Sequence, residues 1–450
     1  MRMKFTTVEQ AVAWLDEQAT PIRRAGIDKI RCALSYLDNP HKGLPVIHIT
    51  GTNGKGSTTT YLKQLLLSQG LSVGAFTSPH IMRFNERFSY NGMSISDEDL
   101  IRITERMVDV NDYMESTEYG KLVFFELYTV MMALYFNEKQ PDVCIIEVGI
   151  GGENDCTNVF DAQLVILTTI GLDHEDLLGD TVEAVAKEKS GLIKENAVVI
   201  TGPIQDSPLQ VVTDRVTDKN GYQYKFGIDY GFSNAVNLGE YGSSFDFWLM
   251  SRGEKLSYSF QISMLGEYQI DNATIALRAF FAWMLMNSEI VDFDQAYQYL
   301  KETNWMARME RISNNPVIYI DGAHNAHGLT ALKKLVYQYF PNKRLTILYA
   351  GLSTKNQDEQ LPILNAFDAE KIYLTQFDHQ KAMSIDDFVE VADESNRLHK
   401  SSFELAADWE EFVINYSREF SQSVDRVLLI TGSLYFVADV RQFILEKVQV

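Results

Sequence analysis

The 450-residue sequence has little of what several protein classes require. It contains only three cysteines, Cys32, Cys144 and Cys156, and no CxxC pair, which argues against a disulfide framework and for a reducing compartment. Its longest apolar runs, such as residues 280–286, are far shorter than the roughly 18 residues that a membrane-spanning helix needs. The first residues also lack the apolar core of a signal peptide. We therefore expect a soluble, cytoplasmic protein.

Positive charge is scarce as well. The sequence has 40 Lys and Arg against 61 Asp and Glu, a net charge of −21 with histidine neutral. This balance argues against a nucleic-acid or anionic-membrane surface, because such surfaces are built from clusters of Lys and Arg. It does not exclude one local phosphate site. An anionic ligand would then be held by a magnesium ion, a helix N-terminus or a few placed cations.

The composition that is present, 46% hydrophobic and 22% charged, is typical of a globular protein. Short β-branched runs alternate with segments of helical period, which predicts βαβ units and a mostly parallel sheet. Residues 244–250 and 255–262 alternate in period two around a polar turn, which indicates an antiparallel hairpin. We expect two α/β domains, residues 1–300 and 301–450. The predicted strands are residues 46–49, 143–148, 164–170, 198–201, 317–320, 345–350, 371–374 and 427–431.

Polar features follow four of these predicted strands. A glycine-rich loop follows the first, Glu147 ends the next, Asp173 and His174 follow residues 164–170, and Asp321 follows residues 317–320. Open α/β sheets bind ligands at the carboxyl ends of their strands. The sequence therefore predicts one ligand-binding edge.

The glycine-rich loop is typical of a phosphate site, in which backbone N–H groups at a helix N-terminus hold the anion and a lysine reaches the outer phosphates. It departs from the GxxxxGK[ST] pattern, because Gly56 separates Lys55 from Ser57 and position 49 is Ile. A glycine-rich turn between a strand and a helix is the alternative. The loop consists of Gly51, Thr52, Asn53, Gly54, Lys55, Gly56 and Ser57.

Ser78, Glu147 and His174 are candidate ligands for one divalent ion. A carboxylate and a hydroxyl suit magnesium, whereas a histidine ligand would equally suit manganese. Glu147 could instead be a helix-pairing carboxylate, and His174 a loop residue.

Two further positions are ambiguous from the residues alone. Lys189 has charged neighbours in a helical stretch, which favours a solvated helix face. Asp321 and His324 suggest an acid and an imidazole above a sheet, although an asparagine-containing turn is the alternative.

Taken together, these segments resemble a known family. Residues 48–58, HITGTNGKGST, resemble the nucleotide loop of the Mur-ligase superfamily, and specifically that of folylpolyglutamate synthases and dihydrofolate synthases. The similarity continues in order along most of the chain. The matching blocks are TSPH (77–80), RFNER (83–87), EVGIGGENDCTN (147–158), KEKSGLIK (187–194), GEYQIDN (266–272), ARME (307–310), DGAHNAHG (321–328) and TGSLY (431–435).

The resemblance implies a P-loop ATPase-like N-terminal domain and a smaller, Rossmann-like C-terminal domain with glutamate-ligase function. It implies an ATP-dependent amide ligase, in which a folate γ-carboxylate attacks the γ-phosphate of ATP and L-glutamate then displaces phosphate from the acyl phosphate. Joining dihydropteroate to glutamate is a second candidate activity. A nucleotide switch that ligates nothing, or an inactive paralogue, is the competing interpretation. The block at Asp321 and His324 argues against a switch, and retention of Lys55, Glu147, His174 and Lys189 argues against an inactive paralogue.

The resemblance also implies roles for single residues. Lys189 would be carbamylated and hold a second metal, so that Mg²⁺ occupies two sites, with K⁺ as a further candidate ion. Lys55, Lys189 and His324 would be catalytic, and His324 and Ser433 would lie on the glutamate side. Residues that contact ATP would be the phosphate loop, Asn272, Arg308 and Asp321. Because this set is divided between two domains, domain closure would exclude water from the acyl phosphate. A monomer is expected.

Phe124, Phe125 and Glu126 resemble the family's pterin-pocket block, in which aromatic rings stack on a flat ring and a carboxylate pairs with its N–H edge. The aromatic core of a helix is the alternative.

The sequence departs from the family pattern at Glu153, where many members have Arg, at Met306-Ala307, where Pro-Gly is usual, and at Ala326, where Pro is usual. None of these removes an expected ATP or metal ligand. They bear on the choice of substrate, above all on whether dihydropteroate is accepted.

Overall fold

The computed structural model describes residues 4–18, 26–80, 83–353, 357–389 and 403–447. The chain divides into two compact units. The N-terminal unit comprises Met1–Val236, Ser244–Ile262 and Glu267–Thr303, and the C-terminal unit comprises Asn237–Ser243, Ser263–Gly266 and Asn304–Val450.

The N-terminal unit is built on an eight-stranded sheet in the order β4-β3-β2-β5-β1-β6-β7-β8. The strands from β2 to β8 in this order are parallel, whereas β3 and β4 add to one edge in antiparallel pairs. The central strands β2, β5, β1 and β6 are buried and mostly apolar, which matches the two covered faces of a parallel sheet. The strands are β1 (Val46–Thr50), β2 (Val73–Phe76), β3 (Phe88–Tyr90), β4 (Met93–Ser94), β5 (Val143–Glu147), β6 (Leu164–Leu167), β7 (Val198–Thr201) and β8 (Tyr222–Lys225).

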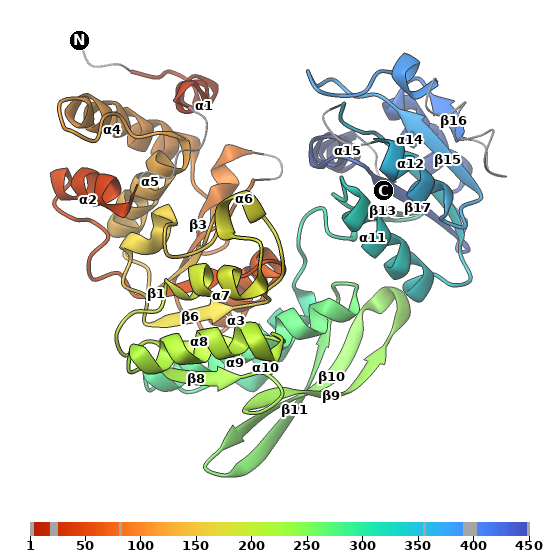
Figure 1. The fold of residues 1–450 in the computed structure, drawn as a ribbon. Helices are drawn as coiled ribbons and strands as arrows, with labels where there is room; N and C mark the ends of the chain where they lie inside the picture. The colour runs from red at the N-terminus through yellow and green to blue at the C-terminus, as the bar shows by residue number, and fades with distance from the viewer. Residues whose placement is uncertain (1–3, 19–25, 81–82, 354–356, 390–402, 448–450) are drawn as a thin grey trace. The chain divides into compact units, whose positions relative to one another are not determined.

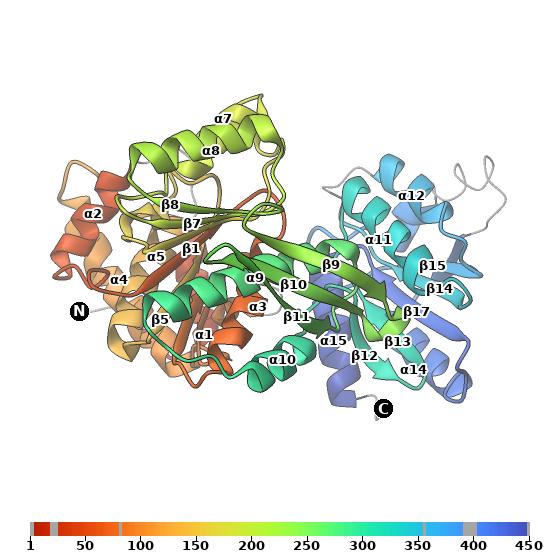
Figure 2. The ribbon, with the colours of Figure 1, turned by 90° about the horizontal axis from the view of Figure 1, so that it is seen from below.

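Helices cover both faces of this sheet (Figure 2). On one face, α3 packs against β1, β2 and β5, and α9 packs against β6 and β7. On the other face, one large cluster of buried apolar side chains joins the strands to α2, α4 and α5. The helices are α1 (Val8–Glu17), α2 (Ile27–Tyr36), α3 (Lys55–Leu67), α4 (Asp97–Glu115), α5 (Phe124–Lys139), α6 (Glu175–Leu178), α7 (Val182–Ser190), α8 (Asp206–Asp218), α9 (Glu267–Met286) and α10 (Phe293–Glu302), with 3₁₀ turns η1 (Phe84–Arg87) and η2 (Cys156–Val159).

A small three-stranded sheet, in the order β11-β10-β9, follows β8 along the chain. Its strands are β9 (Tyr230–Asn237), β10 (Ser243–Ser251) and β11 (Glu254–Ile262), with the 3₁₀ turn η3 (Gly239–Tyr241) between the first two. Arg252 and Gly253 connect β10 to β11 and both have positive φ, as a two-residue hairpin turn requires. The predicted hairpin is confirmed, and β9 is an additional strand.

The C-terminal unit, whose sheet is drawn mainly in teal and blue in Figure 1, has six strands in the order β12-β13-β17-β14-β15-β16. Only the β12–β13 pair is antiparallel. Side chains of α11 and α12 share a buried cluster with the strands, and α15 packs against β17 and β12. The elements are β12 (Glu310–Asn314), β13 (Val317–Ile320), α11 (Ala326–Tyr339), β14 (Arg344–Tyr349), α12 (Gln357–Asn365), β15 (Lys371–Thr375), β16 (Phe403–Ala406), α14 (Trp409–Glu419), β17 (Arg426–Thr431) and α15 (Leu434–Lys447).

The predicted fold class, two α/β parts with mostly parallel sheets, is confirmed. The expectation of a single ligand-binding edge is wrong in one respect. The phosphate loop, Glu147 and Asp173-His174 follow β1, β5 and β6, which are neighbours in one sheet, but Asp321 follows β13 of the second sheet. Apolar strand patterns indicate that a strand exists but not which sheet it joins. In the part of the chain that the structure describes, no helix is long and apolar enough to cross a membrane.

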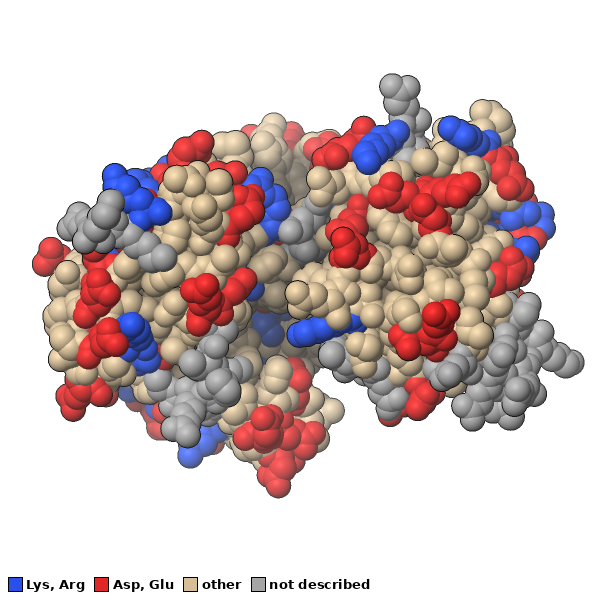
Figure 3. Space-filling view, turned by 90° about the horizontal axis from the view of Figure 1, so that it is seen from above, with Lys and Arg blue, Asp and Glu red and all other residues tan. Residues whose placement is uncertain are grey.

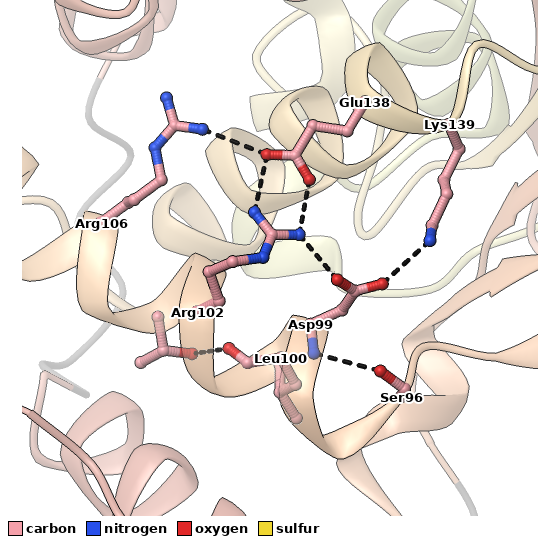
Figure 4. Close-up of polar contacts among 8 residues, drawn as sticks. Ser96, Asp99, Leu100, Arg102, Arg106, Glu138 and Lys139 are labelled. Atoms are coloured by element: carbon pink, nitrogen blue, oxygen red, sulfur yellow. Dashed lines mark hydrogen bonds and ion pairs between the residues drawn. The ribbon is translucent and has the colours of Figure 1, made fainter.

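Charged side chains are interspersed over the molecular face shown in Figure 3, where acidic groups stand among single basic ones. A local example is the ion-pair network between α4 and α5 in Figure 4. Arg102 bonds both Glu138, at 2.6 Å, and Asp99, at 2.7 Å, and Arg106 and Lys139 extend the network. Because Arg102 is 46% exposed, solvent screens these pairs and each stabilises the fold only modestly.

Candidate active site

The phosphate loop leaves β1, and its last three residues form the start of α3. Gly51 has φ of 153° and Gly54 has φ of 86°. A Cβ atom at Gly51 would overlap the Thr168 hydroxyl, and one at Gly54 would overlap the Asn272 side-chain oxygen. Both positions therefore need glycine for the backbone angle and for space.

Residues after β6 hold this loop in place. The Thr168 hydroxyl donates to the Asn53 carbonyl at 2.6 Å, and the Asn53 N–H donates to the Thr169 hydroxyl at 3.0 Å. Thr52 exchanges two further hydrogen bonds of 3.0 Å with the backbone of Gly171. The loop is therefore fixed by a neighbouring strand exit rather than by its own sequence alone.

Polar side chains close the loop on the side of α3. The Lys55 ammonium donates to the carbonyls of Gly51, at 2.9 Å, and Thr52, at 3.4 Å. Its positive charge therefore lies against the phosphate loop. Gln269 on α9 donates to the Ser57 hydroxyl at 3.4 Å and accepts from Asn272 at 3.1 Å. Gln269 and Asn272 are both buried.

Ser78 and Glu147 come together at the exits of β2 and β5. The Ser78 N–H lies 3.4 Å from a carboxylate oxygen of Glu147, which is only 4% exposed. A buried carboxylate beside a serine offers the oxygen atoms that magnesium prefers. The donor chemistry of these two residues fits a hard divalent cation.

His174 differs from Glu147 in its surroundings. It is exposed, has a left-handed backbone with φ of 52°, and its Nε2 atom lies 3.8 Å from Asp173. Among the described residues, no three His, Cys, Asp or Glu side chains are grouped to hold a metal ion. Of the predicted set of Ser78, Glu147 and His174, a hydrogen bond joins the first two, and the role of His174 as a third ligand stays a prediction.

The segment that follows Glu147 is held by the buried Asp155. Its carboxylate accepts from the Ile150 N–H at 3.0 Å and from the Thr157 hydroxyl at 2.5 Å. The hydroxyl of Thr157 in turn pairs with the buried His48 at 2.8 Å. Burial is the main cause that raises the pKa of Asp155, and these hydrogen bonds oppose it.

Lys189 on α7 is only 3% exposed, so the interpretation of a solvated helix face is wrong. Gly152 packs so closely on the end of α7 that a Cβ atom there would clash with the Lys189 backbone. Burial, and to a lesser extent the positive charge of Lys55, lower the pKa of Lys189 to about 8. A buried amine with a lowered pKa is a hallmark of functional lysines.

The aromatic block begins α5. Phe124 is 37% exposed, whereas residues 127–136 of the same helix are buried. The Phe125 ring lies 5.8 Å from that of Phe76 and meets the backbone at Gly149. Glu126 is buried and its Oε2 atom lies 2.9 Å from the ammonium of Lys29. The carboxylate predicted to face a substrate ring is therefore engaged by the protein itself.

In the C-terminal unit, Asp321 organises the turn that carries Arg308. Its two oxygens accept from the N–H groups of Met309 and Ala323, both at 2.9 Å. Burial raises the pKa of Asp321, and the nearby Arg308 counteracts the rise. Arg308 is exposed and flanked by Ala307 and Met309, whose φ values of 54° and 43° are left-handed. Backbone strain of this kind is typical of functional turns.

His324 and Ser433 follow β13 and β17, which are neighbours in the second sheet. The Nδ1 atom of His324 lies 2.9 Å from the Gly322 carbonyl, so Nδ1 carries the proton and Nε2 is the acceptor in the neutral ring. The Ser433 hydroxyl is fully buried and accepts from the Tyr435 N–H at 3.2 Å.

Three residues of this arrangement had no separate prediction. Gln269 lies within the GEYQIDN block, where its side chain could have been suspected, whereas Thr168 and Lys29 carry no recognisable motif. Their partners lie 212, 115 and 97 positions away in the sequence, so only the fold brings them together.

Comparisons with known proteins agree with this arrangement. The Mur ligase middle domain family matches residues 49–280, and the Mur ligase, glutamate ligase domain family matches residues 307–434. A dihydrofolate synthase/folylpolyglutamate synthase of Bacillus subtilis (strain 168) is 32% identical over 440 residues, or 97% of this chain and 99% of its own. The crystal structure of a Thermotoga maritima folylpolyglutamate synthase aligns with a TM-score of 0.84 at 30% identity, covering 98% of this chain and 97% of that one. A folylpolyglutamate synthase in complex with AMPPCP and folate aligns with a TM-score of 0.74 at 29% identity, covering 98% and 100%.

The fold, the phosphate loop and both domain matches define a protein of the Mur-ligase class. Within that class, the chain belongs to the family of folylpolyglutamate synthases and dihydrofolate synthases.

Proposed function

We propose that this protein is an ATP-dependent ligase that adds L-glutamate to the γ-carboxylate of a reduced folate through an acyl phosphate. One observation carries the proposal. The N-terminal unit holds the phosphate loop after β1, Glu147 at the end of the neighbouring strand β5, and the buried Lys189 on α7. Phosphoryl transfer depends on positioning and charge neutralisation, which these groups can supply. The relative solved with AMPPCP and folate binds both kinds of ligand in one protein of this fold.

The residues divide the work by their chemistry. Backbone N–H groups of the phosphate loop and Lys55 would hold the phosphates, with Asn272, Arg308 and Asp321 completing the nucleotide contacts. Ser78 and Glu147 would hold Mg²⁺, with His174 as a third ligand, and the ion would neutralise phosphate charge. His324 and Ser433 would meet the incoming glutamate. Lys189, once carbamylated, would offer a carboxylate to a second metal, and K⁺ is a further candidate ion.

Glutamate incorporation tests the ligase activity directly. The purified protein, ATP, magnesium and labelled glutamate are incubated with tetrahydrofolate, and labelled product is measured. Incorporation is expected. If the protein binds ATP but incorporates glutamate with neither tetrahydrofolate nor dihydropteroate, the ligase activity is refuted, and a nucleotide switch or an inactive paralogue is favoured.

Dihydrofolate synthesis is a second candidate activity, favoured by the name of the Bacillus subtilis relative. The same assay with dihydropteroate as acceptor measures it. Incorporation with tetrahydrofolate alone would restrict the protein to chain elongation.

Glu147→Gln tests the metal site, with Glu195→Gln on the surface as the control. The first substitution should abolish turnover and leave the melting temperature nearly unchanged, whereas the control should retain full turnover, because the Glu195 side chain is 63% exposed. Near-normal turnover of Glu147→Gln would remove this residue from the site.

We further propose a monomer in the cytoplasm. The three cysteines are free thiols, which suits a reducing compartment. Gel filtration with light scattering measures the oligomeric state, and cell fractionation measures the location.

A further inference from the structure

A buried ion pair joins two helices of the N-terminal unit. The ammonium of Lys29 on α2 lies 2.9 Å from Oε2 of Glu126 on α5, and their side chains are 10% and 5% exposed. Burying two charges is costly even when they are paired, so a buried ion pair is weak evidence for stability, and in some proteins such a pair fixes a geometry.

Glu126 also fixes the start of its own helix. The same Oε2 atom accepts from the Val123 N–H at 2.9 Å, which satisfies one of the unpaired donors at the helix N-terminus. A single carboxylate oxygen therefore ties α2 to the first turn of α5.

That first turn carries Phe124 and Phe125. The Phe125 ring is pressed against Gly149 so closely that a Cβ atom there would lie 2.8 Å from the ring. Gly149 follows Glu147 by two residues and borders Asp155. The position of the first turn of α5 thus determines where the Phe125 ring meets the segment that leaves β5.

The surroundings of the pair leave little room for a ligand at Glu126. The 3₁₀ turn η2 packs against both α2 and α5, and Cys156 at its start lies within electrostatic range of Glu126 and Lys29. The negative charge of Glu126 is already matched by Lys29, so the N–H edge of a substrate ring would meet a neutralised carboxylate.

We propose that Lys29 and Glu126 are a positioning pair that holds the first turn of α5, and with it Phe124 and Phe125, in the place where the ring of the folate acceptor binds. Neither residue contacts the substrate in this arrangement. The inference rests on the proposed function, because it concerns the acceptor of that reaction. It assigns Glu126 a different role from the one its motif predicts, and it assigns a role to Lys29, which no motif indicated.

The test is the double substitution Lys29→Met with Glu126→Gln, in the full-length protein. Glutamine can still accept from the Val123 N–H, so the helix cap remains while the interhelical tie is lost. The KM for the folate acceptor should rise at least tenfold, and the KM for ATP should stay within twofold. Equilibrium binding of folate in the presence of AMPPCP should weaken by the same factor.

A matched control is the exposed pair Lys121–Glu115, whose side chains are 46% and 63% exposed. Lys121→Met with Glu115→Gln should leave both KM values unchanged. Lys29→Arg, which keeps the charge, should recover most of the acceptor affinity.

Three outcomes would overturn the proposal: an unchanged acceptor KM in the double variant, equal rises in both KM values, or a fall in melting temperature alone. If the double variant does not fold, Lys29→Met alone provides the same measurement, because Glu126 still accepts from the Val123 N–H while the tie to α2 is lost. Absence of glutamate incorporation in the wild-type protein would instead refute the proposed function, and folate binding would then still test the pair.

Discussion

Replacing Lys189 by methionine should stabilise the protein and inactivate it at the same time. Burial lowers the pKa of this lysine from 10.5 to about 8. At 1.36 kcal/mol per unit, the charged form costs the native state about 3 kcal/mol. Methionine has a similar length and no charge, so Lys189→Met removes this cost.

The predicted gain depends on pH in a definite direction. The unfolded chain protonates Lys189 below about pH 10.5, whereas the native protein does so only below about pH 8. Below pH 8 both states carry the proton, and the native state bears the full cost. Between pH 8 and 10.5 unfolding takes up a proton, so wild-type stability rises with pH through this window. The advantage of Lys189→Met should therefore approach about 3 kcal/mol at pH 7 and shrink toward zero near pH 10.5.

Urea unfolding at pH 7 and pH 10, in buffer free of carbon dioxide, measures this difference. Lys187→Met is the matched control, because Lys187 lies on the same helix and is exposed. It should change the unfolding free energy by less than about 0.5 kcal/mol at either pH. A Lys189→Met protein that is less stable than wild type at pH 7, or equally stable, would refute the burial argument.

The same lowered pKa makes the proposed carbamate accessible. With a pKa of about 8, roughly one Lys189 in ten is a neutral amine at pH 7, against roughly one in three thousand at 10.5. Only the neutral amine can add carbon dioxide. Active protein in ¹³C-bicarbonate should show one carbamate signal that Lys189→Met lacks and Lys187→Met retains. Spectra and intact mass showing only a free amine would remove the carbamate from the proposed function.

Three further substitutions test the local geometry. Ala307→Gly should raise the unfolding free energy by about 0.5–1 kcal/mol, because φ is 54° at this position; a loss of stability in urea would contradict the strain. Gly54→Ala should weaken AMPPCP binding at least tenfold and destabilise the fold by about 1–3 kcal/mol, since its Cβ atom would overlap Asn272; unchanged affinity in a calorimetric titration would count against the loop as the nucleotide site. Arg102→Ala, which breaks exposed pairs with Glu138, should cost less than about 1 kcal/mol in thermal unfolding, and a larger loss would mean that the network in Figure 4 is more strongly coupled than its exposure indicates.

Much of the sheet could be predicted from local patterns. Strands such as β1, β5 and β6 are buried on both faces, so their sequences are mostly apolar and rich in Val and Ile, and they stand out. β9 was missed because its residues Tyr230–Asn237 include Gly, Ser and Asn and are exposed over half their length. Strands of this kind are stabilised by their neighbours in the sheet, which local sequence does not reveal.

In the candidate site, too, some features could be predicted from local sequence and others could not. The phosphate loop could be recognised because a strand, glycines, Lys55 and a helix are consecutive in the chain. The role of Glu126 could not, because its partner Lys29 lies on another helix and an ion pair between distant residues leaves no periodic pattern.

The parallel α/β class, the phosphate loop and the family could all be predicted from the sequence, because they depend on short segments whose residues act together along the chain. The fold was needed to show that Lys189 is buried and that Lys29 neutralises Glu126. Burial and ion pairing depend on which distant segments pack against a residue. Positive charge is thus scarce in the chain as a whole, whereas the proposed chemistry depends on a few cations, among them Lys55, which the fold holds at the phosphate loop.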